Sequence, residues 1–374
     1  MKKYFILTLI ALITFKSYGQ EGNTLQGVIT TAVPFMLIAG DARAAGLADM
    51  GAATASDAFS QQWNPAKYAF ALKKQGIGVT YTPYLSKLVN DIFLGNITYY
   101  NRLNEQSAFA ASFRYFSAGE IELRETAEQV PLIVKPNELL FDISYSLRLS
   151  ERFSMAVAGR YIRSDLKLQT AIEDSRAANG FAVDVAGYYQ SEEIAYDSFF
   201  GRWRGGFNIS NMGPKIKYND GGSENSLPIN LSIGGGFDFI LDEYNKVGIT
   251  AEIDKLLVPT PEDSNGDGVI DRSDDYYDQS FFSGMVSSFG NSALAWSLGA
   301  EYWYQDSFAF RLGYFNESEK SGARKFVSLG TGFKYTTINF DVSYLFSTSQ
   351  VVSPLEGSLR FGLTFAIGDD YDEY

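Results

Sequence analysis

The sequence predicts an all-β protein, a 14-stranded antiparallel transmembrane β-barrel with an N-terminal helical plug rich in small residues. Its composition favours strands, because aromatic rings fit a pleated surface and glycine weakens helices; the 374 residues include 24 Tyr, 29 Phe and 35 Gly. Apolar and polar side chains alternate over segments long enough to cross a bilayer, which takes a strand about 9–11 residues. Together these observations favour a membrane barrel.

The alternation is clearest between Leu139 and Leu149. The odd positions there are all large and apolar, whereas the even positions include Asp142, Ser144 and Arg148. A soluble β-sandwich would also alternate, but its strands usually have about five or six residues. The polar faces carry small residues and isolated charges, as a lumen would, and the apolar faces end in Tyr or Trp. The expected inward charges are Arg114, Arg148, Arg160, Asp184, Glu252, Glu301, Arg311 and Arg360.

Fourteen strands can be delimited, an even number, as in bacterial outer-membrane barrels. They cover residues 75–84, 91–103, 106–116, 138–149, 153–166, 180–191, 199–211, 227–241, 245–257, 293–305, 307–317, 325–336, 338–347 and 357–368. Short connections alternate with long ones such as 117–137, 212–226 and 258–292. Outer-membrane barrels place their short turns in the periplasm, so we expect both termini there. The barrel then spans residues 75–368, and an acidic periplasmic tail covers 369–374.

The first residues have the pattern of a secretory signal peptide. Lys2 and Lys3 precede an apolar run, and Ser17 and Gly19 are the small residues expected just before a cleavage site. We therefore predict a signal peptide over residues 1–19, cleaved before Gln20. A retained anchor is the alternative, but the apolar run is shorter than the roughly 20 residues that span a bilayer.

Residues 20–74 precede the first strand and differ from the rest of the chain. Gly and Ala dominate the stretch from Gly40 to Ala55, which shows weak helical character and no alternation. Small side chains allow close packing against other backbone, so we expect a hatch of short helices folded into the lumen. There, the inward charges could pair with Asp41, Arg43 and Asp57. A periplasmic linker is the alternative.

The composition also excludes whole classes of function. The chain contains neither Cys nor His, which removes disulfides, thiolate chemistry, imidazole metal sites and nucleophilic triads with a histidine base. Its net charge of −13 repels nucleic acid, so we expect no nucleic-acid partner. The sequence therefore predicts a protein that is not an enzyme, with a membrane hydrolase as the weakest of the functions considered.

The longest predicted loop, 258–292, contains a pattern typical of calcium-binding loops. Oxygen ligands occupy positions 1, 3, 5, 9 and 12, position 6 is a Gly for the sharp turn, and position 7 offers a main-chain carbonyl. The predicted ligands are Asp263, Asn265, Asp267, Val269, Asp271 and Asp274. Asp274 stands where a bidentate Glu is usual, and no flanking helices are evident, so we expect Ca²⁺ to act as a structural clamp. A solvated acidic turn is the alternative.

Apolar side chains in three predicted extracellular loops suggest contact surfaces for a protein partner. These residues are Leu132, Ile133, Phe281, Phe282, Met285, Val351 and Val352. They could equally fold over the mouth of the barrel or extend its strands.

The stretch from Gly40 to Phe70, GDARAAGLADMGAATASDAFSQQWNPAKYAF, resembles the N-terminal signature of the PorV family, also called LptO. The motif residues are Gly46, Ser56, Asp57, Asn64 and Pro65. The resemblance implies a 14-stranded barrel of the FadL-like superfamily in the outer membrane, surrounded by its lipids. It also implies a non-enzymatic role in type IX protein secretion, with three partners: the translocon pore protein, the C-terminal domains of cargo, and the surface attachment complex.

A FadL-like channel for hydrophobic small molecules is the main alternative function. Such a channel would need an apolar lumen, whereas the expected inward residues are Gly, Ala, Ser and charges. The sequence therefore favours a carrier of proteins over a channel.

Overall fold

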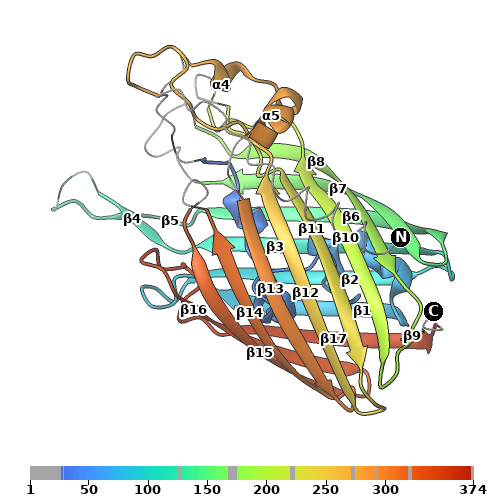
Figure 1. The fold of residues 1–374 in the computed structure, drawn as a ribbon. Helices are drawn as coiled ribbons and strands as arrows, with labels where there is room; N and C mark the ends of the chain where they lie inside the picture. The colour runs from blue at the N-terminus through green and yellow to red at the C-terminus, as the bar shows by residue number, and fades with distance from the viewer. Residues whose placement is uncertain are drawn as a thin grey trace.

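The computed structural model describes residues 27, 29–124, 126, 128–166, 175–219, 224–270, 274–290, 294–318 and 322–371. In this part of the chain, 14 long strands form one closed antiparallel barrel (Figure 1). They are β1 (Lys73–Pro83), β2 (Ile92–Arg102), β3 (Ser107–Ala118), β6 (Asn137–Ser150), β7 (Phe153–Asp165), β8 (Ala178–Gln190), β10 (Phe200–Met212), β11 (Asn230–Ile240), β12 (Asn245–Leu256), β13 (Leu294–Tyr304), β14 (Phe308–Glu317), β15 (Lys325–Tyr335), β16 (Ile338–Ser347) and β17 (Arg360–Asp370). The predicted barrel is confirmed.

Each strand pairs with the next along the chain, and β17 pairs with β1 to close the sheet. Closure leaves the barrel no open edge, which a bilayer requires because no water can satisfy free main-chain groups there. Three short strands lie outside the barrel wall. β4 (Ile121–Leu123) and β5 (Leu132–Val134) form a separate hairpin, and β9 (Ile194–Ala195) extends the sheet beside β10.

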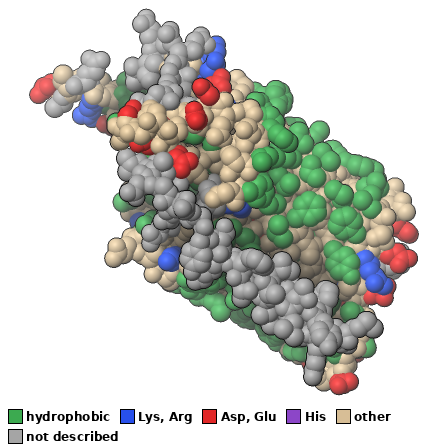
Figure 2. Space-filling view, turned by 45° about the horizontal axis from the view of Figure 1, so that its top comes forward, with side chains coloured by type: hydrophobic (Ala, Val, Ile, Leu, Met, Phe, Trp, Pro, Cys, Tyr) green, Lys and Arg blue, Asp and Glu red, His purple; other side chains and the backbone are tan. Residues whose placement is uncertain are grey.

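The alternation in sequence becomes an inside and an outside. On β6, Phe141, Ile143 and Tyr145 are about half exposed, whereas Asp142 and Ser144 are buried. Figure 2 shows hydrophobic side chains gathered on the barrel wall, as a lipid-facing surface requires, with charged side chains towards the ends. None of the described helices is long and apolar enough to cross a membrane.

The two ends of the barrel differ. Short turns join β2 to β3, β6 to β7 and β15 to β16 at one end, and long loops occupy the other, where α4 (Asp275–Asp278), α5 (Phe281–Ser287), η4 (Ser288–Gly290) and the β4–β5 hairpin lie (Figure 1). Both termini were expected at the short-turn end. Tyr371 lies there, its N–H donating to the Leu72 carbonyl, but Gly27 lies at the long-loop end, its N–H donating to the Pro261 carbonyl. The predicted cleavage before Gln20 falls outside the described residues.

Four short helices of the N-terminal segment fill the lumen: η1 (Pro34–Leu37), α2 (Ala42–Gly46), α3 (Ser60–Trp63) and η2 (Pro65–Phe70). Glycines on the plug and on the wall let the two backbones meet. A Cβ on Gly46 would lie 3.0 Å from the Cα of Gly330, and one on Gly206 would lie 2.0 Å from the Ala52 carbonyl oxygen. Small residues therefore do in this plug what the sequence predicted: they permit backbone-to-backbone packing.

Candidate functional site: the filled lumen

A chain of ion pairs joins the plug to the wall in the half of the barrel nearer the short turns. Arg43, on α2, donates to both carboxylate oxygens of Glu301 at 3.0 and 2.9 Å and to Asp57 at 2.8 Å. Arg311 donates to Glu301 at 2.7 Å and to Asp341 at 2.7 Å. Charged hydrogen bonds of this kind are strong and directional, so they hold α2 in one position against β13, β14 and β16.

The loop after α2 is fixed by separate anchors. Glu252 on β12 accepts hydrogen bonds from the N–H groups of Gly51 and Ala52 at 3.1 and 2.8 Å. Arg204 on β10 donates to the Ala53 carbonyl at 2.6 Å, and Arg360 on β17 donates to Asp49 at 3.0 Å. The loop after α2 is therefore tied to β10 and β12 through its main chain and to β17 through the side chain of Asp49.

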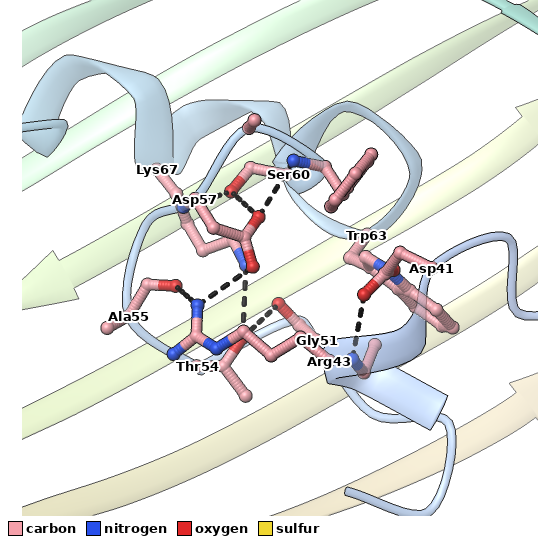
Figure 3. Close-up of polar contacts among 12 residues, drawn as sticks. Asp41, Arg43, Gly51, Thr54, Ala55, Asp57, Ser60, Trp63 and Lys67 are labelled. Atoms are coloured by element: carbon pink, nitrogen blue, oxygen red, sulfur yellow. Dashed lines mark hydrogen bonds and ion pairs between the residues drawn. The ribbon is translucent and has the colours of Figure 1, made fainter. Parts of the chain in front are cut away.

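Figure 3 shows how the plug holds its own shape. Trp63 donates through Nε1 to Asp41 at 2.6 Å, and the Ser60 hydroxyl donates to Asp57 at 3.1 Å. Lys67 donates to the Thr54 hydroxyl at 3.1 Å. Burial lowers the pKa of Lys67 to about 8 and raises the pKa of Asp41 to about 6. Both groups lie on the plug, inside the ring of spanning strands.

The plug motif identified in the sequence takes part in these contacts. Asn64 donates to the carbonyls of Ala52 and Gly187 and caps η2, which begins at Pro65. Asp57 pairs with Arg43, and its neighbour Ser56 is half-buried. Gly46 lies against the barrel wall at Gly330. The expectation that inward charges pair with the plug holds for Arg43 and Glu301. Asp41 and Asp57, however, contact plug residues.

Nearer the long loops, the lumen is apolar. Leu94, Leu140 and Ile162 lie close to the loop ends of β2, β6 and β7, point inward and are fully buried. A second patch contains Phe315, Phe326 and Leu345. The expectation that only Gly, Ala, Ser and charges face inward is therefore wrong at this level, because plug residues cover these side chains as lipid covers the outer wall.

Sequence reasoning missed the residues that fill this apolar layer. Val33, Phe35 and Met36 are at most 2% exposed and pack against Leu94, Leu140 and Ile162. The only local signal was the short apolar run from Ala32 to Ile38, which shows neither helical nor strand periodicity. Consecutive apolar residues at a strand end, such as Leu139 to Phe141, place apolar side chains on both faces of the strand. Such runs could have indicated the apolar layer of the lumen.

The predicted calcium loop is described except for residues 271–273, so the predicted ligand Asp271 lies outside the described residues. Asp263 accepts hydrogen bonds from the N–H groups of Gly266 and Gly268, and Asp274 accepts from that of Ser264. The side-chain oxygen of Asn265 accepts a hydrogen bond from the N–H of Asp267. A carboxylate oxygen of Asp267 accepts one from the N–H of Val269. Among the described residues, no three acidic side chains converge as a metal site would require. The site stays a prediction.

The apolar loop residues lie on three different loops at the long-loop end. Leu132 and Ile133, on β5, are each 51% exposed, and Phe282 on α5 is 62% exposed. The others are Phe281 and Met285 on α5, and Val351 and Val352 between β16 and β17. The β4–β5 hairpin projects away from the loop that carries α5 (Figure 1), so the structure does not bring these residues into one patch.

Comparison with known proteins identifies the family. Residues 21–263, more than half of the chain, match the family described as "Type IX secretion system protein PorV". The chain belongs to the PorV family. The resemblance seen between Gly40 and Phe70 is therefore confirmed, and the chain is an outer-membrane component of type IX secretion. No curated protein matches the sequence.

Solved structures support the fold of this PorV-family chain. The CymD monoaromatic hydrocarbon channel is 13% identical, with a TM-score of 0.52 over 90% of this chain and 99% of that one. The toluene transporter TbuX of Ralstonia pickettii is 10% identical, with a TM-score of 0.50 over 89% of this chain and 100% of that one. At such low identity the likeness shows the shared barrel fold alone.

Proposed function

We propose that this protein is a non-enzymatic carrier in type IX secretion. It binds the translocon pore protein and the C-terminal domain of a secreted cargo protein, and it delivers the cargo to the surface attachment complex. The long loops face the outside of the cell, the carboxyl terminus lies in the periplasm, and the signal peptide is removed before Gln20. Membership of the PorV family is the first support for this proposal.

The observation that carries the proposal is the locked plug. Opening a path through the barrel would break the contacts of Arg43 with Glu301 and leave buried charges unpaired. Breaking one buried pair typically costs about 3–5 kcal/mol. A barrel whose lumen is closed in this way acts through its outer surfaces, and its loops offer the largest of these.

The β4–β5 hairpin is the strongest candidate for a docking element. It is a two-stranded sheet that stands apart from the barrel, and Ile121, Leu132 and Ile133 on it are between 41% and 51% exposed. An extended peptide could add to a free edge of such a hairpin through main-chain hydrogen bonds. The apolar side chains would then supply the buried contact that a protein interface needs.

A secretion assay tests this assignment. Replacing Leu132 and Ile133 with Ser should leave the barrel intact and cause cargo to accumulate in the periplasm or in the translocon. The matched control replaces Leu88, an exposed residue of the loop between β1 and β2 at the same end of the barrel, with Ser. Normal secretion by the double variant would remove the hairpin from the mechanism.

Deletion of the whole protein separates the carrier from the alternative channel. Loss of secretion with unchanged general porin permeability supports the carrier. If deletion abolishes only the uptake of a hydrophobic nutrient, the protein is a FadL-like channel and not a carrier. The specific observation that favours this second candidate is the apolar layer of the lumen around Leu140 and Phe326.

We also propose that Ca²⁺ binds the loop from Asp263 to Asp274. The donor set suits this ion, because Ca²⁺ prefers six to eight hard oxygen ligands. Asp263 and Asp274 are buried in the loop, and a cation there would offset the cost of burying their charges. The bound ion would fix the first third of the loop and so lower the entropy lost when a partner docks beside Phe281 and Phe282.

A further inference from the structure

A hollow lies in the lipid-facing wall of the barrel, on β8, β10 and β11. Its volume is about 390 Å³, and it is lined by four glycines and by large apolar or aromatic side chains such as Phe207 and Ile233. A Cβ on Gly205 would meet nothing closer than 4.0 Å, so this glycine opens towards the lipid, whereas the neighbouring Gly206 faces the plug. The missing side chains leave room for a hydrocarbon chain against the outer wall.

Five aromatic rings on the same strands lead from this hollow to the short-turn end. Trp203 on β10 meets Phe237 on β11 edge-on, with ring centroids 4.6 Å apart. Phe237 and Phe239 are also 4.6 Å apart, and Phe199 lies 5.4 Å from Phe239. Tyr196 stacks on Phe199 at 4.8 Å and completes the row.

The turn between β8 and β10, residues 191–199, is folded so that it adds two rings to this row. β9 in this turn pairs with the start of β10, and Tyr196 follows β9 directly. A Cβ on Gly201 would lie 2.8 Å from the Tyr196 ring and 2.3 Å from the Phe237 ring, so only glycine lets these rings lie on the main chain. Tyr196 and Trp203 remain 41% and 53% exposed, as suits rings at a membrane interface.

Beyond the rings, a pocket of about 660 Å³ lies between this turn and the turn from β11 to β12. Tyr196 and Phe199 contribute to its lining. Its charged lining residues are Glu193, Asp197, Asp242, Glu243 and Lys246. Four carboxylates against one ammonium group make the lining negative, so it repels an anionic headgroup and attracts a cationic one.

Two of these carboxylates are already bound within the protein. Arg202 donates to Glu193 at 2.8 Å, and Asp242 accepts the N–H of Tyr244 at 2.8 Å. Asp197 and Glu243 are exposed on the two turns, where an incoming ammonium group would meet them.

The hollow and the turn pocket are separated by the depth of one lipid leaflet. Gly234 lines the hollow and Ile240 lines the pocket, six residues further along β11. At about 3.3 Å per residue this is roughly 20 Å along the strand, and the usual tilt of about 40° reduces it to about 15 Å in depth. Half of a hydrocarbon core of about 30 Å is the same distance.

We propose that the hollow, the ring row and the turn pocket together bind one phospholipid with an ammonium headgroup. An acyl chain lies in the hollow against Gly205, and the rings contact the part of the chain nearer the glycerol. The ammonium group lies between Asp197 and Glu243, with the phosphate beside Lys246. The placement of this lipid in the periplasmic leaflet rests on the orientation given with the proposed function.

The combination of features is what indicates a lipid. The ring row alone would be the ordinary aromatic girdle of a membrane barrel, and the carboxylates alone would be a solvated turn. A cationic peptide could use the rings and carboxylates, but it would not use a hollow that faces hydrocarbon. A ligand with a cationic head and an apolar tail about one leaflet long uses all three.

Native mass spectrometry of the purified full-length protein in mild detergent tests the site. Phosphatidylethanolamine and phosphatidylglycerol with the same acyl chains are added in equal amounts. The wild-type protein should retain one phosphatidylethanolamine, favoured about fivefold, the order that one charge contact at a protein surface provides. Equal retention of the two lipids, or retention of neither, would overturn the proposal. If a lysine-rich peptide binds where no lipid is retained, the site belongs to a protein partner.

Filling the hollow tests the acyl-chain part of the site. Gly205→Leu puts a side chain into the hollow without a clash in the protein, and it should lower lipid retention several-fold. Gly159→Leu is the matched control, because Gly159 lies on the outer wall of β7, away from the hollow, and its Cβ would also meet nothing within 4 Å. Equal retention by these two variants, with folding of each read from heat-modifiable migration, would refute the hollow as a binding site.

Neutralising the turn tests the headgroup part. Asp197→Asn with Glu243→Gln should abolish the preference for phosphatidylethanolamine. Glu105→Gln with Glu151→Gln, which removes two exposed carboxylates from other turns at the same end, should keep it. Phosphoethanolamine, which has the headgroup without acyl chains, should not displace the lipid at equal concentration, and displacement would contradict a site that holds both parts.

These measurements are independent of secretion. Lipid retention by the purified protein requires neither the translocon nor cargo, so its failure removes the lipid site and leaves the proposed carrier intact. Conversely, normal secretion in a deletion strain would refute the carrier without affecting the retained lipid.

Discussion

The plug core and the strap, which we define as residue 27 together with residues 29–37, are parts of one N-terminal segment inside one barrel, yet they are held by different forces. The core, from Asp41 to Lys67, is fixed by buried ion pairs and by hydrogen bonds from its main chain to the wall. The strap is fixed mainly by apolar contacts and by main-chain bonds to loops. The difference teaches that one segment inside a closed lumen can be held by charge in one part and by apolar contacts in another.

The largest effect should come from breaking the ion-pair chain of the core. Glu301→Gln leaves Arg43 and Arg311 without their shared carboxylate, and we expect a loss of about 3–5 kcal/mol because both guanidinium groups are buried. The measurement is the midpoint of the heat-modifiable shift. Asp370→Asn, which breaks the exposed pair with Lys73, is the control and should move the midpoint little. Equal shifts in the two variants would show that the core is not locked by charge.

The close approach of plug and wall can be broken at a single glycine. Gly206→Ala would place a Cβ 2.0 Å from the Ala52 carbonyl oxygen, so the plug must shift, at a cost of about 1–3 kcal/mol. The neighbouring Gly205→Ala is the matched control, because its Cβ would meet nothing closer than 4.0 Å. Thermal unfolding should separate these adjacent variants, and identical midpoints would contradict the close packing of Gly206 on Ala52.

Hydrogen exchange should sharpen the comparison without any substitution. The N–H of Ala52 is bonded to Glu252 in the locked core, whereas that of Ala32 is bonded to a loop carbonyl at the mouth. We expect at least tenfold faster exchange for the strap, because regions held by few directional contacts open locally at lower free energy. Equal protection of the two regions would mean that the plug and the strap move as one body.

The smallest effect on the barrel should come from the calcium loop. Asp263→Ala with Asp267→Ala should abolish Ca²⁺ binding and increase protease cleavage between β12 and β13, while strand content and membrane insertion stay normal. A chelator should have the same effect on the wild-type protein and no further effect on the variant. Cleavage that is unchanged by chelator would refute the clamp.

The sequence by itself determined the number and position of the barrel strands, but not the short strands β4, β5 and β9. Among the described residues, each of the 14 barrel strands begins and ends within three residues of its prediction. This succeeds because the alternation on a segment such as Leu139 to Leu149 is local, and because a strand must be long enough to cross the bilayer. The Gly and Ala content between Gly40 and Ala55 likewise predicted close packing inside the lumen.

The tertiary structure alone decided which charges meet and which apolar residues face inward. Arg43 and Glu301 are 258 residues apart, and only closure of the barrel around the plug brings them to 3.0 Å. Leu140 and Phe141 are adjacent and both apolar, yet one contacts the strap and the other faces lipid. Hydrophobicity drives a side chain away from water without specifying its neighbour, so what lies on each side of the wall depends on where the N-terminal segment folds.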